Sequence, residues 1–115
     1  MHSESAKRPD LVPGTLAMLI LRTLARNGSL HGYGIAQFIR QTTDEVLQVE
    51  EGSLYPALQR LLINGWVEAE WRMSEMNRRA RFYSLTPAGR KHLVTEIAGF
   101  SRMVHAIGQV LGDAV

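Results

Sequence analysis

The stretch that most constrains the fold of this chain covers residues 52–66, which have the pattern of one short helix with both ends specified. Ser53 suits the N-cap position, where a hydroxyl accepts a hydrogen bond from a free backbone N–H. Pro56 falls in the expected first turn, where its missing N–H removes no hydrogen bond. Gly65 follows the last turn, where a left-handed residue is favoured. We therefore predict a helix that begins near Ser53 and ends before Gly65.

This predicted helix has two different faces. Leucines recur at the i, i+4, i+7 and i+8 positions, a spacing that places them on one stripe facing a core. They are Leu54, Leu58, Leu61 and Leu62. The other side carries Pro56, Gln59, Arg60 and Ile63, with Tyr55 at its flank. A polar face beside a helix N-terminus, which favours anions, suits insertion into a DNA major groove. It equally suits the solvated surface of an ordinary core helix, and this helix alone does not distinguish the two.

Length and composition limit the class of protein. A chain of 115 residues with 45% hydrophobic content is expected to form one domain with at most an appended element. It has no cysteine, which excludes disulfide scaffolds, thiolate zinc sites and cysteine nucleophiles. Residues 1–10 are polar and have no apolar signal region, and no apolar run is long enough to span a bilayer. We therefore expect a soluble, cytoplasmic protein with a flexible N-terminal tail.

The charge is unevenly distributed along the chain. The net charge is +2, yet residues 52–91 contain seven basic residues against three acidic ones, a local excess of four positive charges. Such an excess fits a patch that faces phosphates, since each phosphate neutralised releases counterions. A solvated basic surface is the alternative interpretation.

The chain before residue 52 is predicted to contain two helices. Residues 16–26 carry apolar side chains on more than one side, which suits a helix packed both in its own domain and against a partner. A short extended piece begins at Leu30, and a second helix is predicted over residues 33–42. The glycines on either side of Tyr33 imply a close backbone approach or an unusual backbone dihedral there. Tyr33 either donates its hydroxyl to a phosphate or packs as a turn aromatic, and His31 is interpreted as a hydrogen-bonded turn residue.

After Gly65 the apolar period changes from 3.6 to 2, which predicts strands. Residues 66–71 alternate as a half-buried strand, residues 73–79 are polar, and residues 80–85 form the returning strand. The two strands form a hairpin whose loop carries Arg78 and Arg79, and Arg81 lies at the start of the returning strand.

The last predicted helix covers residues 87–111 and begins with Thr86 as N-cap and Pro87 at the first helical position. Its apolar residues recur at alternating steps of four and three, the 3.5-residue period of a helix that lies along another helix. They are Leu93, Ile97, Phe100, Val104, Ile107 and Leu111. The natural partner is the same helix, or the first helix, of a second subunit. A helix folded back on its own domain is the alternative.

No constellation in the sequence indicates an enzyme, a cofactor site or a metal site. The histidines at positions 2, 31, 92 and 105 are scattered. His92 and Glu96 are spaced as i, i+4, but two ligands do not make a metal site without a third. A solvated helix face is the better interpretation of this pair.

The order of these elements is that of a winged helix-turn-helix, mostly α with a small β-hairpin (α+β). In that fold the central helix enters the major groove and the hairpin reaches the DNA backbone or the adjacent minor groove. We predict a flexible tail over residues 1–10, a DNA-binding domain over residues 11–86 and a C-terminal dimerisation helix over residues 87–115. A winged-helix module that binds another protein is the alternative function, although it would not need the basic hairpin.

The sequence also resembles the PadR-like transcriptional regulators. The matching stretches are residues 30–35, 51–58, 65–67, 78–83 and 85–89, and the most specific is the Gly-Ser-Leu-Tyr-Pro-Ala-Leu string of residues 52–58. The chain resembles the short branch of that family, which has a single C-terminal helix. The resemblance implies a homodimeric regulator of transcription, usually a repressor, that binds a palindromic operator and is often released by a small hydrophobic or phenolic effector.

Carried over to this sequence, the resemblance implies DNA contacts from the central helix and from the hairpin. The predicted DNA-binding residues are Ser53, Tyr55, Pro56, Gln59, Arg60, Arg78, Arg79, Arg81 and Tyr33. Some relatives hold planar ligands between tryptophans of their C-terminal helices. The C-terminal helix of this chain has no tryptophan, and Phe100 and Met103 are the candidates for such a contact.

Overall fold

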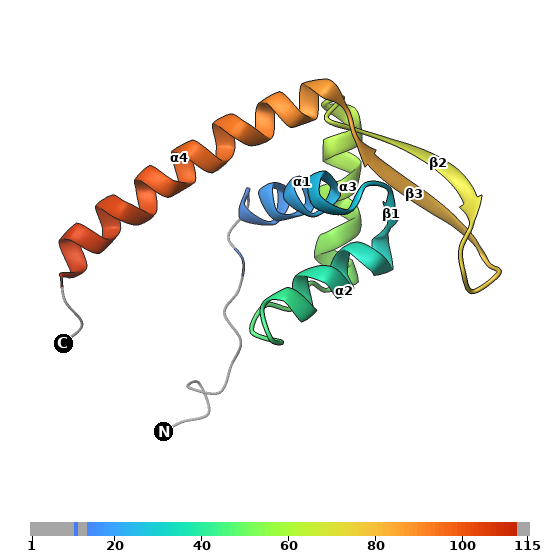
Figure 1. The fold of residues 1–115 in the computed structure, drawn as a ribbon, viewed down its shortest axis with the longest axis horizontal. Coiled ribbons are helices and arrows are strands. Elements are labelled where there is room, and N and C mark those ends of the chain that lie inside the picture. The colour runs from blue at the N-terminus through green and yellow to red at the C-terminus, as the bar shows by residue number, and fades with distance from the viewer. Residues whose placement is uncertain (1–10, 12–13, 113–115) are drawn as a thin grey trace.

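The computed structural model describes residue 11 and residues 14–112, and within these residues the chain forms four helices and three strands (Figure 1). In chain order they are α1 (Thr15–Asn27), β1 (Leu30–His31), α2 (Gly32–Thr42), α3 (Glu51–Ile63), β2 (Val67–Met73), β3 (Arg79–Leu85) and α4 (Pro87–Leu111). The predicted fold class, mostly α with a small hairpin, is confirmed. The predicted tail (residues 1–10) and the last residues of the predicted C-terminal segment (113–115) lie outside the described residues.

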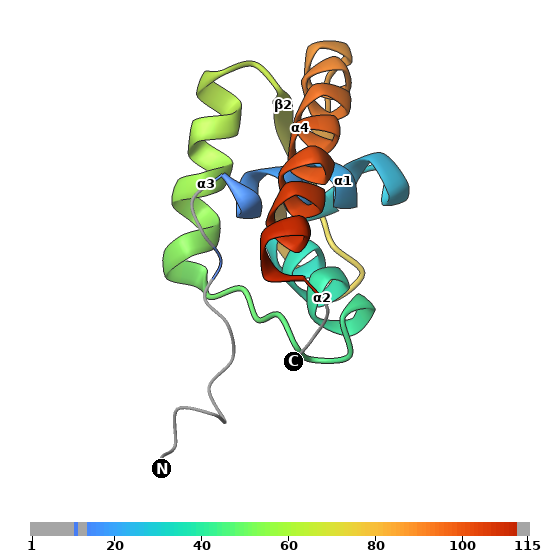
Figure 2. The ribbon, with the colours of Figure 1, turned by 90° about the vertical axis from the view of Figure 1, so that its left-hand side faces the viewer.

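The core is built around α1, which contacts α2, α3, α4 and β3 and lies at the centre of the fold (Figures 1 and 2). Its buried residues point to more than one side, as the sequence predicts. They are Leu16, Met18, Ile20, Leu21, Thr23 and Leu24. The hydroxyl of Thr23 donates to the Leu19 carbonyl at 2.7 Å, so the buried polar group is satisfied.

The helix α3 begins earlier than the sequence suggests, and the prediction of Ser53 as its N-cap is wrong. The N-cap is Glu50, which has an extended backbone, and the carboxylate of Glu51 occupies the first turn, where the helix dipole favours an anion. The backbone N–H of Ser53 donates to the Glu50 carbonyl at 3.0 Å, inside the helix. Pro56 consequently lies in the second turn and not in the first, so the carbonyl of Gly52 has no helical N–H partner. Because Gly52 is exposed, water can reach that carbonyl.

The other end of α3 and its apolar stripe agree with the prediction. Gly65 has a φ of +77°, and its N–H donates to the Leu62 carbonyl at 3.0 Å, while the N–H of Trp66 donates to the Leu61 carbonyl at 3.0 Å. These two bonds are those of a Schellman C-cap, which requires a left-handed residue at the position of Gly65. Leu54, Leu58 and Leu61 are buried, and Leu62 packs against the core.

The sheet is antiparallel, with the strand order β1-β3-β2. The β2–β3 ladder runs from the pair Val67 and Leu85 to the pair Met73 and Arg79, so both strands are longer at the turn than predicted. The turn is tight because Asn77 adopts a left-handed conformation, with a φ of +58°. As a result Arg79 lies in β3 together with Arg81, and only Arg78 lies in the turn. The prediction that Arg79 belongs to the loop is wrong, whereas Arg81 lies in the returning strand as predicted.

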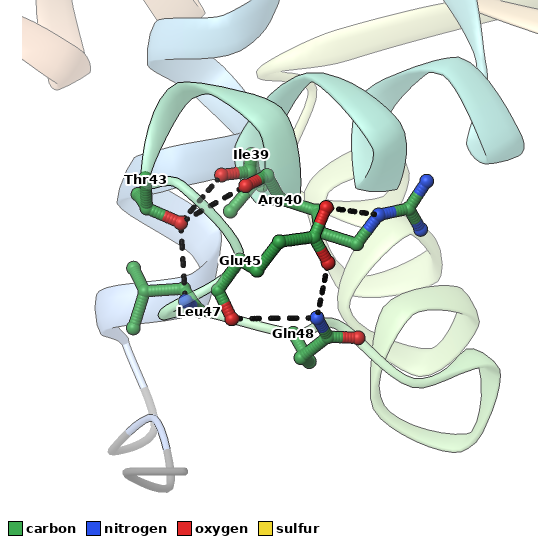
Figure 3. A network of polar contacts seen from close by, with 6 residues as sticks. All are labelled: Ile39, Arg40, Thr43, Glu45, Leu47 and Gln48. Carbon is green, nitrogen blue, oxygen red and sulfur yellow. Dashed lines mark hydrogen bonds and ion pairs between the residues drawn. The ribbon is translucent and has the colours of Figure 1, made fainter.

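The segment between α2 and α3 is held by a polar network (Figure 3). The hydroxyl of Thr43, the C-cap residue of α2, accepts from the Leu47 N–H at 3.1 Å. The carboxylate of Glu45 lies 3.6 Å from the Arg40 side chain and accepts from the Gln48 amide at 3.1 Å. This network ties the end of α2 to the chain that enters α3, so it orients the start of that helix.

The start of α4 meets the end of α3 in a close-packed corner. Thr86 is the N-cap, as predicted: its hydroxyl oxygen accepts from the Gly89 N–H at 2.9 Å and its hydroxyl donates to the Gly65 carbonyl at 2.7 Å. The N–H of Thr86 also donates to the Trp66 carbonyl at 3.1 Å. One threonine side chain therefore caps α4 and links it to the C-cap of α3.

We expect Thr86→Ala to lower the free energy of unfolding by about 1–2 kcal/mol, because the substitution removes an N-cap and leaves the Gly65 carbonyl without its donor. Urea denaturation would measure the loss. Thr86→Ser is the control, since it keeps the hydroxyl and should remain close to the original stability. Equal losses in both variants would contradict the role given to the hydroxyl.

Candidate nucleic-acid interface

The side of α3 opposite the leucine stripe is exposed. It carries five of the predicted DNA-binding residues, namely Ser53, Tyr55, Pro56, Gln59 and Arg60. Because the buried stripe attaches the helix to the core through its other side, this polar face is presented outward on a rigid support. Its amide, guanidinium and hydroxyl groups can form hydrogen bonds with the edges of base pairs.

Tyr55 joins the start of α3 to the start of α2. A Cβ added at Gly32 would lie 2.7 Å from the Tyr55 hydroxyl oxygen, so the tyrosine packs directly on the glycine backbone. The close approach predicted beside Tyr33 is therefore present at Gly32. Burial raises the pKa of Tyr55, and the nearby Glu51 and Tyr83 raise it further. Its hydroxyl can donate a hydrogen bond.

The hairpin β2–β3, which we call the wing, has two faces that differ in what surrounds their arginines. Residues directly opposite in the ladder share a face. The inner face of the wing comprises Ala69, Trp71, Met73, Arg79, Arg81 and Tyr83. The Arg79 guanidinium lies 5.2 Å from the Trp71 ring centroid, and the Arg81 guanidinium lies 6.0 Å from that of Tyr83.

The outer face of the wing is the opposite one and includes Glu70, Arg72 and Phe82. Arg72 on this face contacts other residues of the protein. Its guanidinium lies 4.3 Å from the Phe82 ring centroid, its Nε lies 2.9 Å from a Glu70 carboxylate oxygen, and it donates to the Ser29 hydroxyl. Its charge and its N–H groups are therefore used by neighbouring residues. Arg79 and Arg81 form no ion pair with the described carboxylates.

A cleft of about 920 Å³ separates the inner face of the wing from the helices. Tyr33, Gln37 and Tyr55 line one side of it. The lining residues on the other side include Trp71, Arg78, Arg79 and Arg81, with Glu75 as the nearby carboxylate. Three guanidinium groups against one carboxylate give the cleft a positive charge, which favours a negatively charged occupant.

The structure brings five of the nine predicted DNA-binding residues into this cleft. They are Tyr33, Tyr55, Arg78, Arg79 and Arg81. The other four, Ser53, Pro56, Gln59 and Arg60, lie on the exposed face of α3 and do not line the cleft. Trp71 and Gln37 were missed by the sequence analysis. The alternation of residues 66–71 does place Trp71 on the same face as Ala69, and only the ladder register shows that Arg81 lies opposite Trp71.

The apolar seam of α4 is mostly exposed. Leu93 is an exception, because it is only 3% exposed and belongs to the core of its own domain, so its prediction as a dimerisation residue is wrong. The exposed fractions of the seam rise from 36% at Ile97 to 74% at Leu111. Figure 1 shows that this part of α4 extends away from the other helices. The exposed seam residues are Ile97, Phe100, Val104, Ile107 and Leu111, and Met103 and Val110 lie exposed on the same helix.

His92 is a packing residue at the corner between α3 and α4. Its ring stacks on that of Trp66, with centroids 3.5 Å apart and an interplanar angle of 12°. Its Nε2 lies 3.7 Å from the Glu96 carboxylate. In the described part of the chain no three histidine, aspartate or glutamate side chains are grouped so that they could hold a metal ion.

The fold and this site define the class of protein. An exposed polar helix backed by an apolar core, with a basic two-stranded wing that faces Tyr55 of that helix across a cleft, is a winged helix-turn-helix. In residues 11 and 14–112, no helix has both the length and the apolar content needed to cross a membrane.

Comparison with known proteins gives the family. The model of the transcriptional regulator PadR-like family matches residues 20–95. A transcriptional regulator from Clostridium thermocellum superimposes with a TM-score of 0.81 at 29% identity, covering 90% of this chain and 100% of its own. A PadR family transcriptional regulator from Eggerthella lenta superimposes with a TM-score of 0.71 at 26% identity, covering 88% of this chain and 85% of its own. "Uncharacterized protein X" of Lysinibacillus sphaericus is 30% identical over 86 residues, which are 75% of this chain and 78% of that protein.

The chain belongs to the PadR-like family of transcriptional regulators. This confirms the resemblance noted in the sequence. It also confirms the prediction that the protein is a DNA-binding regulator and not an enzyme.

Proposed function

We propose that the protein is a homodimeric, cytoplasmic repressor that binds a palindromic operator. The observation that carries this proposal is the position of the basic cleft beside the exposed face of α3, because one stretch of duplex can then contact both. Two subunits joined through the exposed seam of α4 would place their α3 helices in successive major grooves, about 34 Å apart.

The two parts of the interface have different roles in this proposal. On α3, Gln59 reads adenine and Arg60 reads guanine, and each good bidentate contact contributes about 1–3 kcal/mol of discrimination against the wrong base. The wing arginines contact phosphates and contribute affinity that does not depend on sequence. A small hydrophobic or phenolic effector would act on the dimer, with Phe100 and Met103 as the exposed α4 side chains that a planar ligand could contact.

We expect the double variant Arg78→Ala, Arg79→Ala to bind every DNA sequence more weakly and to flatten the salt dependence of binding by about two units, because two phosphate contacts are lost. Fluorescence anisotropy with a random-sequence duplex over a series of salt concentrations measures both effects. The control is Arg22→Ala, Arg102→Ala, which removes the same charge from exposed positions on α1 and α4. Binding by the wing variant that equals wild type at every salt concentration would contradict the assignment.

The same titration distinguishes DNA binding from the alternative function, which is that of a winged-helix module that binds another protein. Such a module would bind neither random-sequence DNA nor genomic fragments at low salt. The guanidinium groups of Arg79 and Arg81 on the side of the wing that faces the cleft favour DNA over this alternative.

A further inference from the structure

We propose that Trp71 is a positioning residue that holds the Arg79 guanidinium against a DNA phosphate, so that the cleft between the wing and the helices seats one sugar–phosphate strand. This inference rests on the proposed function of DNA binding.

The position of Trp71 is the first observation. Its side chain is 57% exposed, although an indole gains most from burial, and the described residues do not cover it. It lines the cleft together with Arg79, whose guanidinium lies 5.2 Å from the ring centroid. Tryptophan is the best aromatic partner for a cation at this distance. We infer that the exposed ring limits the side-chain conformations of Arg79, a role that it could not have if it were buried in the core.

The cation–π contact leaves donor groups of Arg79 available. Its guanidinium carbon lies 5.2 Å from the Trp71 ring centroid, and a guanidinium has five N–H donors, so those not turned toward the ring can bind a phosphate. A free arginine on a strand loses more side-chain entropy when it binds a phosphate than one already restricted by its neighbour. The contact with Trp71 therefore prepares Arg79 for binding before DNA arrives.

Arg72 on the same hairpin provides a comparison. It also lies over an aromatic ring, at 4.3 Å from the Phe82 centroid, but its N–H groups are directed to Glu70 and Ser29 on the outer face. Arg79 has no such carboxylate partner among the described residues. One arginine of the wing thus stabilises the wing itself, while the other keeps its donors free on the face that lines the cleft.

The other side of the cleft carries groups suited to the same strand. Tyr33 is 64% exposed, and the Tyr55 hydroxyl, like that of any tyrosine near neutral pH, carries a proton that it can donate. Hydroxyl groups of this kind commonly donate to phosphate oxygens. The cleft therefore has cationic donors on the wing and neutral donors on the helices, a combination that matches a backbone lying between them.

The test compares Trp71→Leu with wild type in binding to a random-sequence duplex over a series of salt concentrations. The variant keeps every charge and an apolar side chain but loses the ring face. We expect binding about fivefold weaker at low salt and a salt dependence flatter by about one unit, because one phosphate contact is lost without loss of charge.

Trp71→Phe keeps a ring and should bind nearly as wild type. Arg72→Ala removes a charge from the outer face and should leave the salt dependence unchanged.

The double variant Trp71→Leu, Arg79→Ala completes the cycle. If the indole acts through Arg79, the double variant should bind no more weakly than Arg79→Ala alone. Fully additive losses, or a salt dependence in Trp71→Leu equal to that of wild type, would overturn the inference. Thermal melts followed by circular dichroism show that each variant is folded. Failure of the wild-type protein to bind the duplex at any salt concentration would instead overturn the proposed function.

Discussion

Phe100→Asp is expected to convert the proposed dimer into a monomer. Phe100 is 43% exposed in the single chain and lies in the middle of the apolar seam of α4. A carboxylate buried there without a partner costs at least about 3 kcal/mol, and a two-fold dimer would bury two of them. The dimer dissociation constant should therefore rise more than about a thousandfold. Because each monomer would then bind a single half-site, affinity for the operator should fall about a hundredfold or more.

Sedimentation equilibrium would measure the first effect, and titration of a genomic fragment selected by the wild-type protein would measure the second. The matched control is Val94→Asp, which adds the same charge to the same helix. Val94 is 67% exposed and lies outside the seam, so this variant should remain a dimer. A dimeric Phe100→Asp protein, or a Val94→Asp protein that dissociates equally, would mean that the seam is not the subunit contact.

Gly89→Ala should destabilise the fold strongly. A Cβ at this position would lie 2.0 Å from the carbonyl oxygen of Trp66 and 2.8 Å from its carbonyl carbon, and both are backbone atoms that cannot rotate away. The first turn of α4 would have to move off the start of β2, which would weaken the hydrogen bond from Thr86 to Trp66. We expect a loss of about 3 kcal/mol, which corresponds to a fall in melting temperature of about 12 °C.

The control for this variant is Gly99→Ala in the same helix. A Cβ at Gly99 would meet nothing within 4 Å, so only the gain in helix propensity remains, which is up to about 1 kcal/mol. Differential scanning calorimetry of the two variants separates the clash from the propensity effect. If Gly89→Ala were as stable as wild type, the close contact between α4 and the Trp66 carbonyl would not exist in solution.

Local signals predicted several elements well. The limits of α4 and its threonine cap, the left-handed Gly65 after α3 and the buried leucines of α3 all follow from residues within one or two turns of each other. Such short-range rules depend only on backbone sterics and on hydrogen bonds at helix ends. They failed at the start of α3, where Ser53 offered a plausible cap but the chain had already turned into the helix at Glu50.

Other features depended on contacts between distant parts of the chain. Leu93 fits the seam of α4 by spacing, yet it is buried because the first turns of α4 pack on α1. The sequence predicts a loop position for Arg79, but this residue lies in β3 because the turn at Asn77 is shorter than the polar segment suggests. Strand alternation places Arg72 on the face opposite Trp71, but the sequence could not show that the face of Trp71 is the one that lines the cleft.

The amino-acid sequence by itself determined the order of the elements, the apolar stripe of α3 and the excess of arginine near the hairpin, because these depend on periodicity and composition along the chain. Only the tertiary structure decided which of those arginines meets the helices across a cleft and which aromatic ring lies beside each one. The reason is physical: a ladder register and a helix-to-sheet contact are set by packing between segments far apart in the chain, and no local pattern contains that information.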